Sequence, residues 1–286
     1  MLFQTKQFQR IAAASAVGTT ERRRLHERDF LHLVIDLPPL AEQRRIVDLI
    51  WAVDEAHDAA AELKQAASGA WLAWADDCWA NTTDEVQLRV LGHCVTGATP
   101  STGNAAFWQS REVPFFAPSD FNGSPIVNVA SRGVSFRGAD SVRLLPAWSV
   151  AQVCIGATYG KVSVLGTCGC TNQQINALVG LDEIDAVTAM AMLATEDSQS
   201  RLRSIVGMTT LPIVKKSAWQ AMAIRWPERN DRETLHGIVA TSAQVAEGAR
   251  RELDALASLR AALLTALLTR ERTIPASYDR FLNPAA

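Results

Sequence analysis

One stretch almost free of glycine and proline, from Glu42 to about Trp79, constrains the fold most strongly. Gly69 is its single interruption and alanine is abundant, so the stretch is predicted to form one long helix. Apolar side chains recur along it at alternating steps of three and four residues, the spacing of a seam that packs on another helix. The predicted seam comprises Leu49, Val53, Ala56, Ala60, Leu63, Ala67, Ala70 and Trp74.

A second stretch, from about Asp231 to Arg270, has the same periodicity. Its predicted seam comprises Ala246, Ala249, Leu253, Leu256, Arg260, Leu263 and Leu267. Two helices of similar length can cover each other's apolar stripes. A single segment of the chain connects the end of the first helix to the start of the second, which favours opposite directions. The sequence therefore predicts an antiparallel, coiled-coil-like helix pair.

Both stretches begin inside an internal repeat. Residues 18–50 align without a gap with residues 207–239, at a constant offset of 189 (207 − 18 = 189). The matched positions are Gly18, Thr20, Phe30, Ile35, Pro38, Ile46 and Ile50 with Gly207, Thr209, Trp219, Ile224, Pro227, Leu235 and Val239. Each copy is predicted to contain a short strand, a turn at proline and a long helix. In the first copy, Phe30–Leu37 is the predicted strand and Pro38-Pro39 the turn.

The segment between the helices, from about Val86 to Pro227, is richer in glycine, serine, threonine, asparagine and proline. Turn residues separate strand-like runs, and two helices follow. The predicted strands are Val113–Ala117, Ser149–Ile155 and Lys161–Leu165, and the predicted helices span Ile184–Ala194 and Glu196–Val206. The expected fold class is α+β, a mixed α/β domain flanked by two long helices.

Composition narrows the classes of function. The net charge of −2 and the pI near 6.2 mean that any nucleic-acid binding must come from a local patch. The five cysteines do not form the even framework of a disulfide-stabilised secreted domain, and no apolar run is long enough to span a membrane. We therefore expect a cytoplasmic protein with no membrane contact.

Neither a catalytic site nor a metal site is predicted. Cys168 and Cys170 lack a second ligand pair at zinc spacing, and His93 beside Cys94 stands alone in the sequence. No nucleophile elbow, phosphate-binding P-loop or methyltransferase-type glycine-rich loop is present. The glycine-rich run Gly156–Lys161 does not have the P-loop spacing.

The string Leu37-Pro38-Pro39-Leu40-Ala41-Glu42-Gln43-Arg44-Arg45-Ile46-Val47 resembles the junction between a target recognition domain and a conserved helix in specificity subunits of type I restriction-modification systems. Further motifs occur in that family's order and extend the resemblance over nearly the whole chain. They are Thr96-Gly97, Thr99-Pro100-Ser101, Phe107-Trp108, Val113-Pro114-Phe115, Pro118-Ser119-Asp120, Leu145-Pro146, Gly156–Lys161 and Thr171-Asn172-Gln173-Gln174.

The resemblance implies a division into domains. Residues 1–37 would be the end of a first target recognition domain, 38–81 the first conserved helix, 82–228 a complete target recognition domain, 229–272 the second conserved helix and 273–286 a tail. Such subunits usually carry two complete recognition domains. The single complete copy here leaves two alternatives open: a homodimer of half-size subunits, or a truncated product.

The family role implies a non-catalytic, DNA-binding chain. Its partners would be double-stranded DNA, methyltransferase subunits and, where one is present, a restriction subunit. S-adenosylmethionine, ATP and magnesium would belong to these partners and not to this chain. The alternative is a helical scaffold derived from such a subunit that no longer binds DNA.

Base reading needs hydrogen-bonding side chains, and phosphate contact needs cations. The candidate DNA-binding residues are Thr99, Ser101, Ser119, Asp120, Asn122, Arg132, Arg137, Arg143, Thr158, Tyr159, Lys161, Asn172, Gln173 and Gln174. Structural roles remain open for three groups: Gly156–Lys161 as a tight turn, Asn172–Gln174 as pins of a strand junction, and Pro118–Asp120 as a hydrogen-bonded turn.

Four tryptophans of the first helix are candidates for partner docking, because aromatic side chains often anchor interfaces. They are Trp51, Trp71, Trp74 and Trp79. The alternative is that they pack on the recognition domain.

Overall fold

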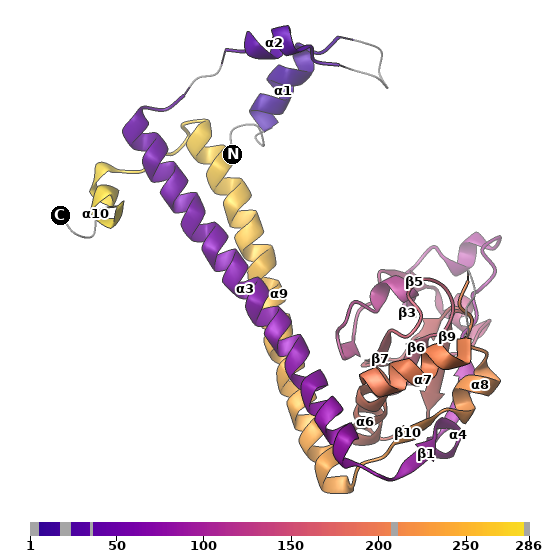
Figure 1. The fold of residues 1–286 in the computed structure, drawn as a ribbon. Helices are drawn as coiled ribbons and strands as arrows, with labels where there is room; N and C mark the ends of the chain where they lie inside the picture. Colours follow the sequence, from indigo (N-terminus) through magenta and orange to yellow (C-terminus); the bar gives the residue numbers. More distant parts are fainter. Residues whose placement is uncertain (1–5, 18–23, 35–36, 207–210, 283–286) are drawn as a thin grey trace. The chain divides into compact units, whose positions relative to one another are not determined.

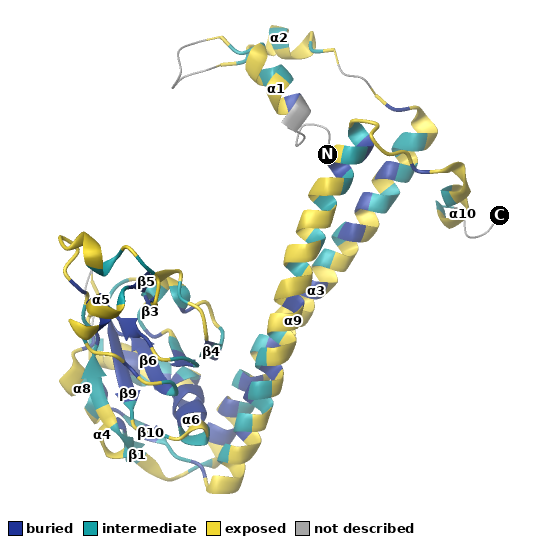
Figure 2. Ribbon diagram, turned by 180° about the vertical axis from the view of Figure 1, so that it is seen from behind, coloured by how far each residue is buried: buried dark blue, intermediate teal, exposed yellow. Residues whose placement is uncertain are grey.

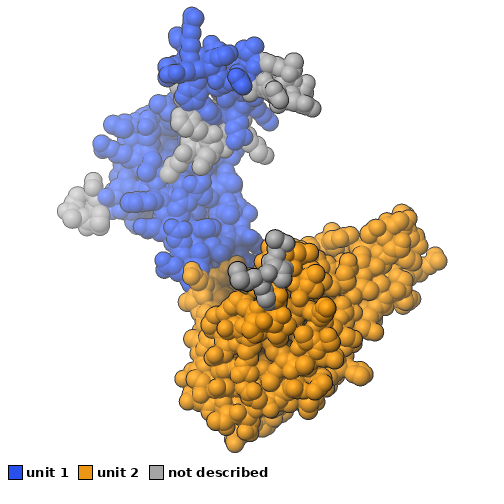
Figure 3. Space-filling view, turned by 45° about the vertical axis from the view of Figure 1, so that its right-hand side comes forward, with its two compact units in different colours: residues 1–63, 248–286 blue, residues 64–247 orange. Residues whose placement is uncertain are grey.

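The computed structural model describes residues 6–17, 24–34, 37–206 and 211–282. The chain forms two compact units: unit 1 comprises residues 1–63 and 248–286, and unit 2 comprises residues 64–247 (Figure 3). Two long helices, α3 (Leu40–Asn81) and α9 (Arg229–Leu268), run through both units (Figure 1). Each unit therefore contains one part of each long helix.

In unit 1, an apolar cluster joins the two long helices. Ile46 and Ile50 of α3 are 3% and 0% exposed and pack with Leu264 and Leu267 of α9 and with Ile274. Residues early in α3 meet residues late in α9, so the pair is antiparallel, as predicted. The remaining elements of unit 1 are α1 (Lys6–Ala14), α2 (Glu27–Leu31), the 3-10 turn η4 (Ala276–Tyr278) and α10 (Asp279–Leu282).

The buried stripe of α3 differs from the predicted seam at alternate positions. Val53, Ala60 and Ala67 are buried, whereas Ala56, Leu63 and Ala70 are exposed. The stripe passes instead through positions one residue further along, such as Ile50 and Trp71. Leu49, where the predicted seam began, lies half-buried at the edge of this stripe. On α9, all seven predicted seam positions are buried or half-buried.

A charged pair crosses the seam in unit 1. Arg260 of α9 donates from Nε to Oδ1 of Asp54 at 2.5 Å and from Nη2 to Oδ2 at 3.2 Å. These hydrogen bonds lower the pKa of Asp54. An arginine at a seam position is accommodated because a carboxylate on the facing helix receives it.

The described residues of unit 2 form three sheets. Their strand orders are β2-β9-β6-β7-β4, β5-β3-β8 and β1-β10. The strands are β1 (Glu85–Gln87), β2 (His93–Thr96), β3 (Val113–Phe116), β4 (Ile126–Val127), β5 (Arg132–Val134), β6 (Ser149–Val153), β7 (Val162–Leu165), β8 (Cys170–Thr171), β9 (Ile175–Val179) and β10 (Ala223–Arg225). The helices and 3-10 turns are α4 (Leu88–Leu91), η2 (Ala105–Phe107), η3 (Pro118–Asp120), α5 (Phe136–Asp140), α6 (Glu183–Ala194), α7 (Glu196–Val206) and α8 (Lys216–Ala221).

The centre of unit 2 is the five-stranded sheet with helix α6 packed against it. Every residue of β6 is buried, and α6 is buried from Ala186 to Leu193 (Figure 2). β3, β6, β7, α6 and α7 occur where the sequence predicted strands and helices, each within two residues of the expected bounds. The predicted α+β fold class is confirmed.

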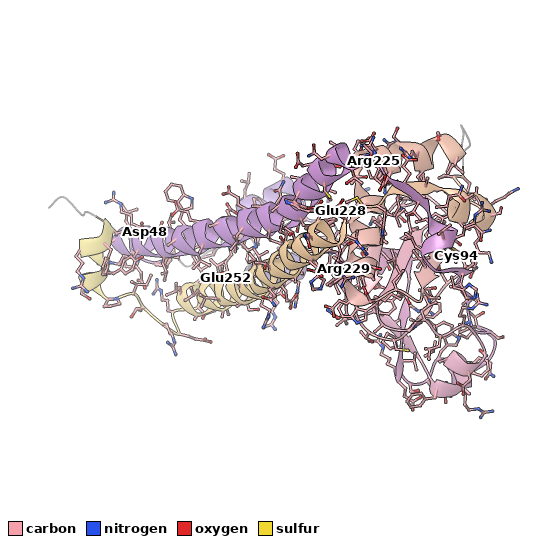
Figure 4. The ribbon with its side chains drawn as sticks, turned by 90° about the horizontal axis from the view of Figure 1, so that it is seen from below. Asp48, Cys94, Arg225, Glu228, Arg229 and Glu252 are labelled. Atoms are coloured by element: carbon pink, nitrogen blue, oxygen red, sulfur yellow. The ribbon has the colours of Figure 1, made fainter. Side chains whose placement is uncertain are left out.

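The ends of the long helices are part of the core of unit 2. Trp71 and Trp79 of α3 and Leu235 and Val239 of α9 belong to one buried cluster that includes α6 residues. Arg225 of β10 donates from Nη1 to the carbonyl of Trp79 at 2.6 Å, which caps the last turn of α3 (Figure 4). The strand that follows α3, β1, pairs antiparallel with β10, which precedes α9. The chain therefore enters and leaves the domain through adjacent strands.

The internal repeat is seen in the helices. α2 begins at Glu27 and α8 at Lys216, and α3 begins at Leu40 and α9 at Arg229, both at the offset of 189 (216 − 27 = 189; 229 − 40 = 189). The strand predicted at Phe30–Leu37 is wrong over its described residues, because Phe30 and Leu31 lie in α2 and residues 32–34 and 37 belong to no strand. In the second copy, β10 has β1 as its partner, whereas in the first copy residues 25–34 belong to no strand and Arg24 forms only an isolated antiparallel bridge with Val17. Ile35 and the glycine-threonine positions of the repeat lie outside the described residues.

We predict that Ile50→Ala loosens the helix pair of unit 1. Truncating this fully buried side chain should lower the free energy of local opening by about 2 to 5 kcal/mol. Hydrogen exchange of backbone amides in residues 40–63 and 248–268 measures this opening. Val47→Ala is the matched control, because Val47 is 50% exposed and should leave protection nearly unchanged. Equal protection in the Ile50 variant would contradict the packing described here.

Candidate functional site

The candidate DNA-binding residues divide by exposure into two groups. The exposed members are Thr99, Ser101, Ser119, Asn122, Arg132, Arg137, Arg143, Thr158, Lys161 and Gln173, and the half-buried members are Asp120, Tyr159, Asn172 and Gln174. The half-buried members make contacts that fix loops, whereas the exposed members are available to a ligand.

The turn before β7 is held from inside the domain. Gly156 and Gly160 have φ of 96° and 95°, the left-handed region that favours glycine. The carbonyl of Gly160 accepts hydrogen bonds from Gln152 and Gln199, each at 3.0 Å. Trp219 in turn donates to Gln152 at 2.7 Å. These contacts support the tight-turn interpretation, with Lys161 exposed directly after the turn.

The segment Asn172–Gln174 joins two loops. Asn172 accepts from the backbone N–H of Gln174 at 3.0 Å and donates to its side chain at 2.9 Å. Gln174 reaches the carbonyl of Ile155, at the start of the tight turn, at 3.4 Å. Gln173 accepts from the hydroxyl of Thr99 at 2.8 Å. Asn172 and Gln174 therefore have the structural role left open by the sequence, and Gln173 is exposed beside Thr99.

Asp120 fixes a second loop. Its Oδ2 accepts from the backbone N–H of Ala117 at 2.8 Å, and its Oδ1 accepts from the backbone N–H of Ser131 at 2.9 Å. Both carboxylate oxygens are thus engaged by the protein, as expected of a hydrogen-bonded turn. Because Ser131 precedes Arg132, Asp120 also fixes the start of β5.

Arg132 stacks on an aromatic pair. Its guanidinium lies 4.4 Å from the ring centre of Trp108 and 5.7 Å from that of Phe115. Trp108 donates from Nε1 to the carbonyl of Ser101 at 3.2 Å. Arg132 and Trp108 line a hollow of about 380 Å³ together with Thr102, Ala105 and Gln109. A guanidinium that is stacked on a ring is preorganised and can still donate hydrogen bonds along its edges.

These contacts connect many of the predicted residues. One series of contacts leads from the Gly156–Lys161 turn to Gln174, and its neighbour Gln173 contacts Thr99. A second series leads from Ser101 to Trp108 and from Trp108 to Arg132. We call the exposed members Thr99, Ser101, Arg132, Lys161 and Gln173 the polar loop set. Its members come from parts of the chain that are distant in sequence, so these connections could not be read from the sequence.

The predicted cations do not share one hollow. Arg132 lines the hollow beside Trp108, whereas Arg143 lines a second hollow of about 410 Å³. Arg137 lies in α5 and Lys161 precedes β7. The second hollow also contains His93 and Lys216, which were not among the predicted DNA-binding residues. Lys216 was missed because it lies far along the sequence from the other candidates.

The four tryptophans of α3 have different environments. Trp71 and Trp79 are 5% and 1% exposed and belong to the core of unit 2, and Trp74 packs partly against that core. Their burial favours packing within the chain and corrects the prediction that they are docking residues. Trp51 alone among these four is exposed, at 65%.

Several of the cysteines have thiols whose pKa is raised by burial. Burial raises the pKa of Cys94 and of Cys170 to about 11 and that of Cys154 to about 12, so these thiols stay protonated at neutral pH. Among the described residues, no group of three or more histidine, cysteine or carboxylate side chains could hold a metal ion. In the same part of the chain, no helix is both long enough and apolar enough to cross a bilayer.

Comparison with known proteins finds a relative in sequence. Over 98 residues, the chain is 36% identical to the type I restriction enzyme HindI specificity subunit of Haemophilus influenzae. This match covers 34% of the chain but spans only 21% of that subunit's length. No family model matches the sequence.

Solved structures share the fold. The S subunit of a type I restriction-modification system from M. genitalium superposes with a TM-score of 0.60 at 15% identity, covering 89% of this chain and 68% of that one. A chain from a structural study of complex assembly and conformational transition of the type I R-M system gives a TM-score of 0.52 at 18% identity, covering 91% and 67%. The resemblance to type I specificity subunits is thus confirmed in sequence and in fold.

We predict that Asp120→Ala destabilises unit 2 by about 1 to 2 kcal/mol, because two backbone N–H groups lose their acceptor. Urea unfolding followed by tryptophan fluorescence reports on this unit, since every tryptophan except Trp51 lies within it. Ser119→Ala is the control, and we expect no measurable change from removing this exposed neighbour. If Asp120→Ala were as stable as the parent chain, the structural role of Asp120 would be refuted.

Proposed function

We propose that this chain is the DNA-specificity subunit of a type I restriction-modification system and that it catalyses no reaction itself. Unit 2 would bind double-stranded DNA, and the helix pair would recruit methyltransferase subunits and, where one is present, a restriction subunit. S-adenosylmethionine, ATP and magnesium would be bound by those partners. The observation that carries the proposal is a domain with exposed polar loops whose entry and exit strands continue into an antiparallel helix pair.

The polar loop set has the chemistry that base reading needs. Gln173, Thr99 and Ser101 offer hydrogen-bond donors and acceptors, and Arg132 is held by Trp108 in a defined position. Arginine can donate two parallel hydrogen bonds to guanine, and amide side chains can pair with adenine. Among the described residues, Arg132 and Lys161 form no ion pair that would neutralise them. We propose that this set contacts DNA.

An exposed apolar face on α3 is suited to a protein partner. Leu40, Val47 and Trp51 are 64%, 50% and 65% exposed. Because successive helix residues are about 100° apart, these three project within roughly 40° of each other. Exposed aromatic and aliphatic side chains that share one face are typical anchors of an interface. We propose that a methyltransferase subunit docks here.

Sequencing of methylated bases in cells tests the proposed function directly. Cells that express the chain with its methyltransferase subunit should methylate one DNA motif, and cells that lack the chain should not. A homodimer of this chain would present two identical recognition domains about a two-fold axis, so its motif would be an inverted repeat. An asymmetric motif would reject the homodimer. Methylation of the same motif without this chain would reject the specificity role.

We predict that Trp51→Ala weakens binding of the methyltransferase subunit by at least about tenfold, as expected for an interface anchor. Titration of the purified subunits against each other measures the dissociation constant. Leu63→Ala is the matched control, because Leu63 is 49% exposed but lies about a third of a turn away from Trp51 around the helix. Equal affinities of the parent and both variants would show that docking occurs elsewhere.

A further inference from the structure

The second hollow of unit 2 gathers three basic side chains from separate parts of the chain. His93 belongs to β2, Arg143 lies in the segment before β6, and Lys216 is the first residue of α8. All three are exposed and line a volume of about 410 Å³. β2 is the edge strand of the five-stranded sheet, so no further strand of that sheet occupies its outer side. The hollow is therefore an open, basic recess at a sheet edge.

Contacts within the hollow hold these side chains without neutralising them. Arg143 donates from Nη1 to the carbonyl of Thr96 at 3.5 Å, a long contact that leaves its other donors available. Lys216 lies close enough to Cys94 for its charge to favour the thiolate, although burial dominates and raises the pKa of this thiol. None of the described residues that line the hollow is acidic. Buried Leu145 and half-buried Val179 contribute an apolar lining.

Such a recess has the chemistry of an anion site. An arginine and a lysine supply fixed positive charge and several N–H donors, and histidine can add another donor. Tetrahedral phosphate oxygens can accept from donors that arrive from several directions, as they do here from β2, the segment before β6 and α8. In addition, Arg143 contacts Thr96, and Thr96 lies directly before the loop that carries Thr99 and Ser101. The recess is therefore linked through Thr96 to the start of the loop that carries Thr99 and Ser101.

We propose that His93, Arg143 and Lys216 form a binding site for one phosphate group of the DNA backbone, an inference that rests on the proposed function. The site positions the duplex and carries no sequence information, because phosphate contacts fix register while base contacts specify sequence.

The salt dependence of DNA binding tests this site. Neutralising a residue that contacts phosphate should make the plot of log affinity against log salt concentration less steep by about one unit. We expect this change for Lys216→Gln in the full chain with a mixed-sequence duplex. Lys215→Gln is the matched control: it removes the same charge from the adjacent position, which does not line the hollow. The control should keep the parent slope.

The outcomes separate this inference from the proposed function. If the parent chain binds DNA and Lys216→Gln keeps its slope, or if Lys215→Gln changes the slope equally, the phosphate site is refuted while DNA binding stands. If the parent chain does not bind DNA, both are refuted.

Titration with inorganic pyrophosphate, followed by the imidazole NMR signals of His93, distinguishes the source of the phosphate. Signals that shift in the parent chain but not in Lys216→Gln, together with the smaller slope for DNA, support the site. Signals that shift while the DNA slope is unchanged would mean that the hollow binds a free anion instead of the backbone.

Discussion

The packing of the long helices into the core of unit 2 is the interaction on which the rest of that unit depends. Trp79 is 1% exposed, and the guanidinium groups of Arg201 and Arg225 lie 5.0 and 5.5 Å from its ring centre. The same arginines reach Glu85 of β1 and the last carbonyls of α3. Trp79 and these two arginines thus connect the end of α3, the β1–β10 sheet and α7.

The polar loops depend on the core through backbone hydrogen bonds more than through side-chain charges. Gln152, fully buried in β6, donates a hydrogen bond to the carbonyl of Gly160. Asp120 accepts one from the backbone N–H of Ser131. Buried polar groups are costly when unpaired, so each of these contacts favours a single loop conformation. Exposed members such as Arg132 and Lys161 are then presented by a rigid frame. Preorganisation of this kind reduces the conformational entropy that is lost when a ligand binds.

Periodicity and turn chemistry were enough to predict the long helices, α6, α7, β3, β6 and β7, because these elements bury apolar side chains in a regular pattern. The seam of α3 was misplaced at alternate positions, because alanine-rich sequences offer several equivalent stripes and only the partner helix decides between them. Phe30 was assigned to a strand because its local sequence is apolar, whereas it lies in α2. Within the candidate site, the sequence predicts hydrogen-bonding and basic residues as candidates, but the recess of His93, Arg143 and Lys216 depends on a fold that brings residues 93 and 216 together.

The pairing of β1 with β10 has a mechanical consequence. Both long helices attach at the same end of this short ladder, where Glu85 lies opposite Arg225. A force that pulls the two helices apart would act on that end of the ladder. The hydrogen bonds between β1 and β10 would then break one after another, which takes less force than breaking them all at once. Arg201 donates a hydrogen bond to Glu85, and Arg225 donates one to the carbonyl of Trp79. Both hydrogen bonds lie at the end of the ladder where separation of the strands would start. The two arginines therefore oppose opening of the β1–β10 ladder at the end where the long helices attach.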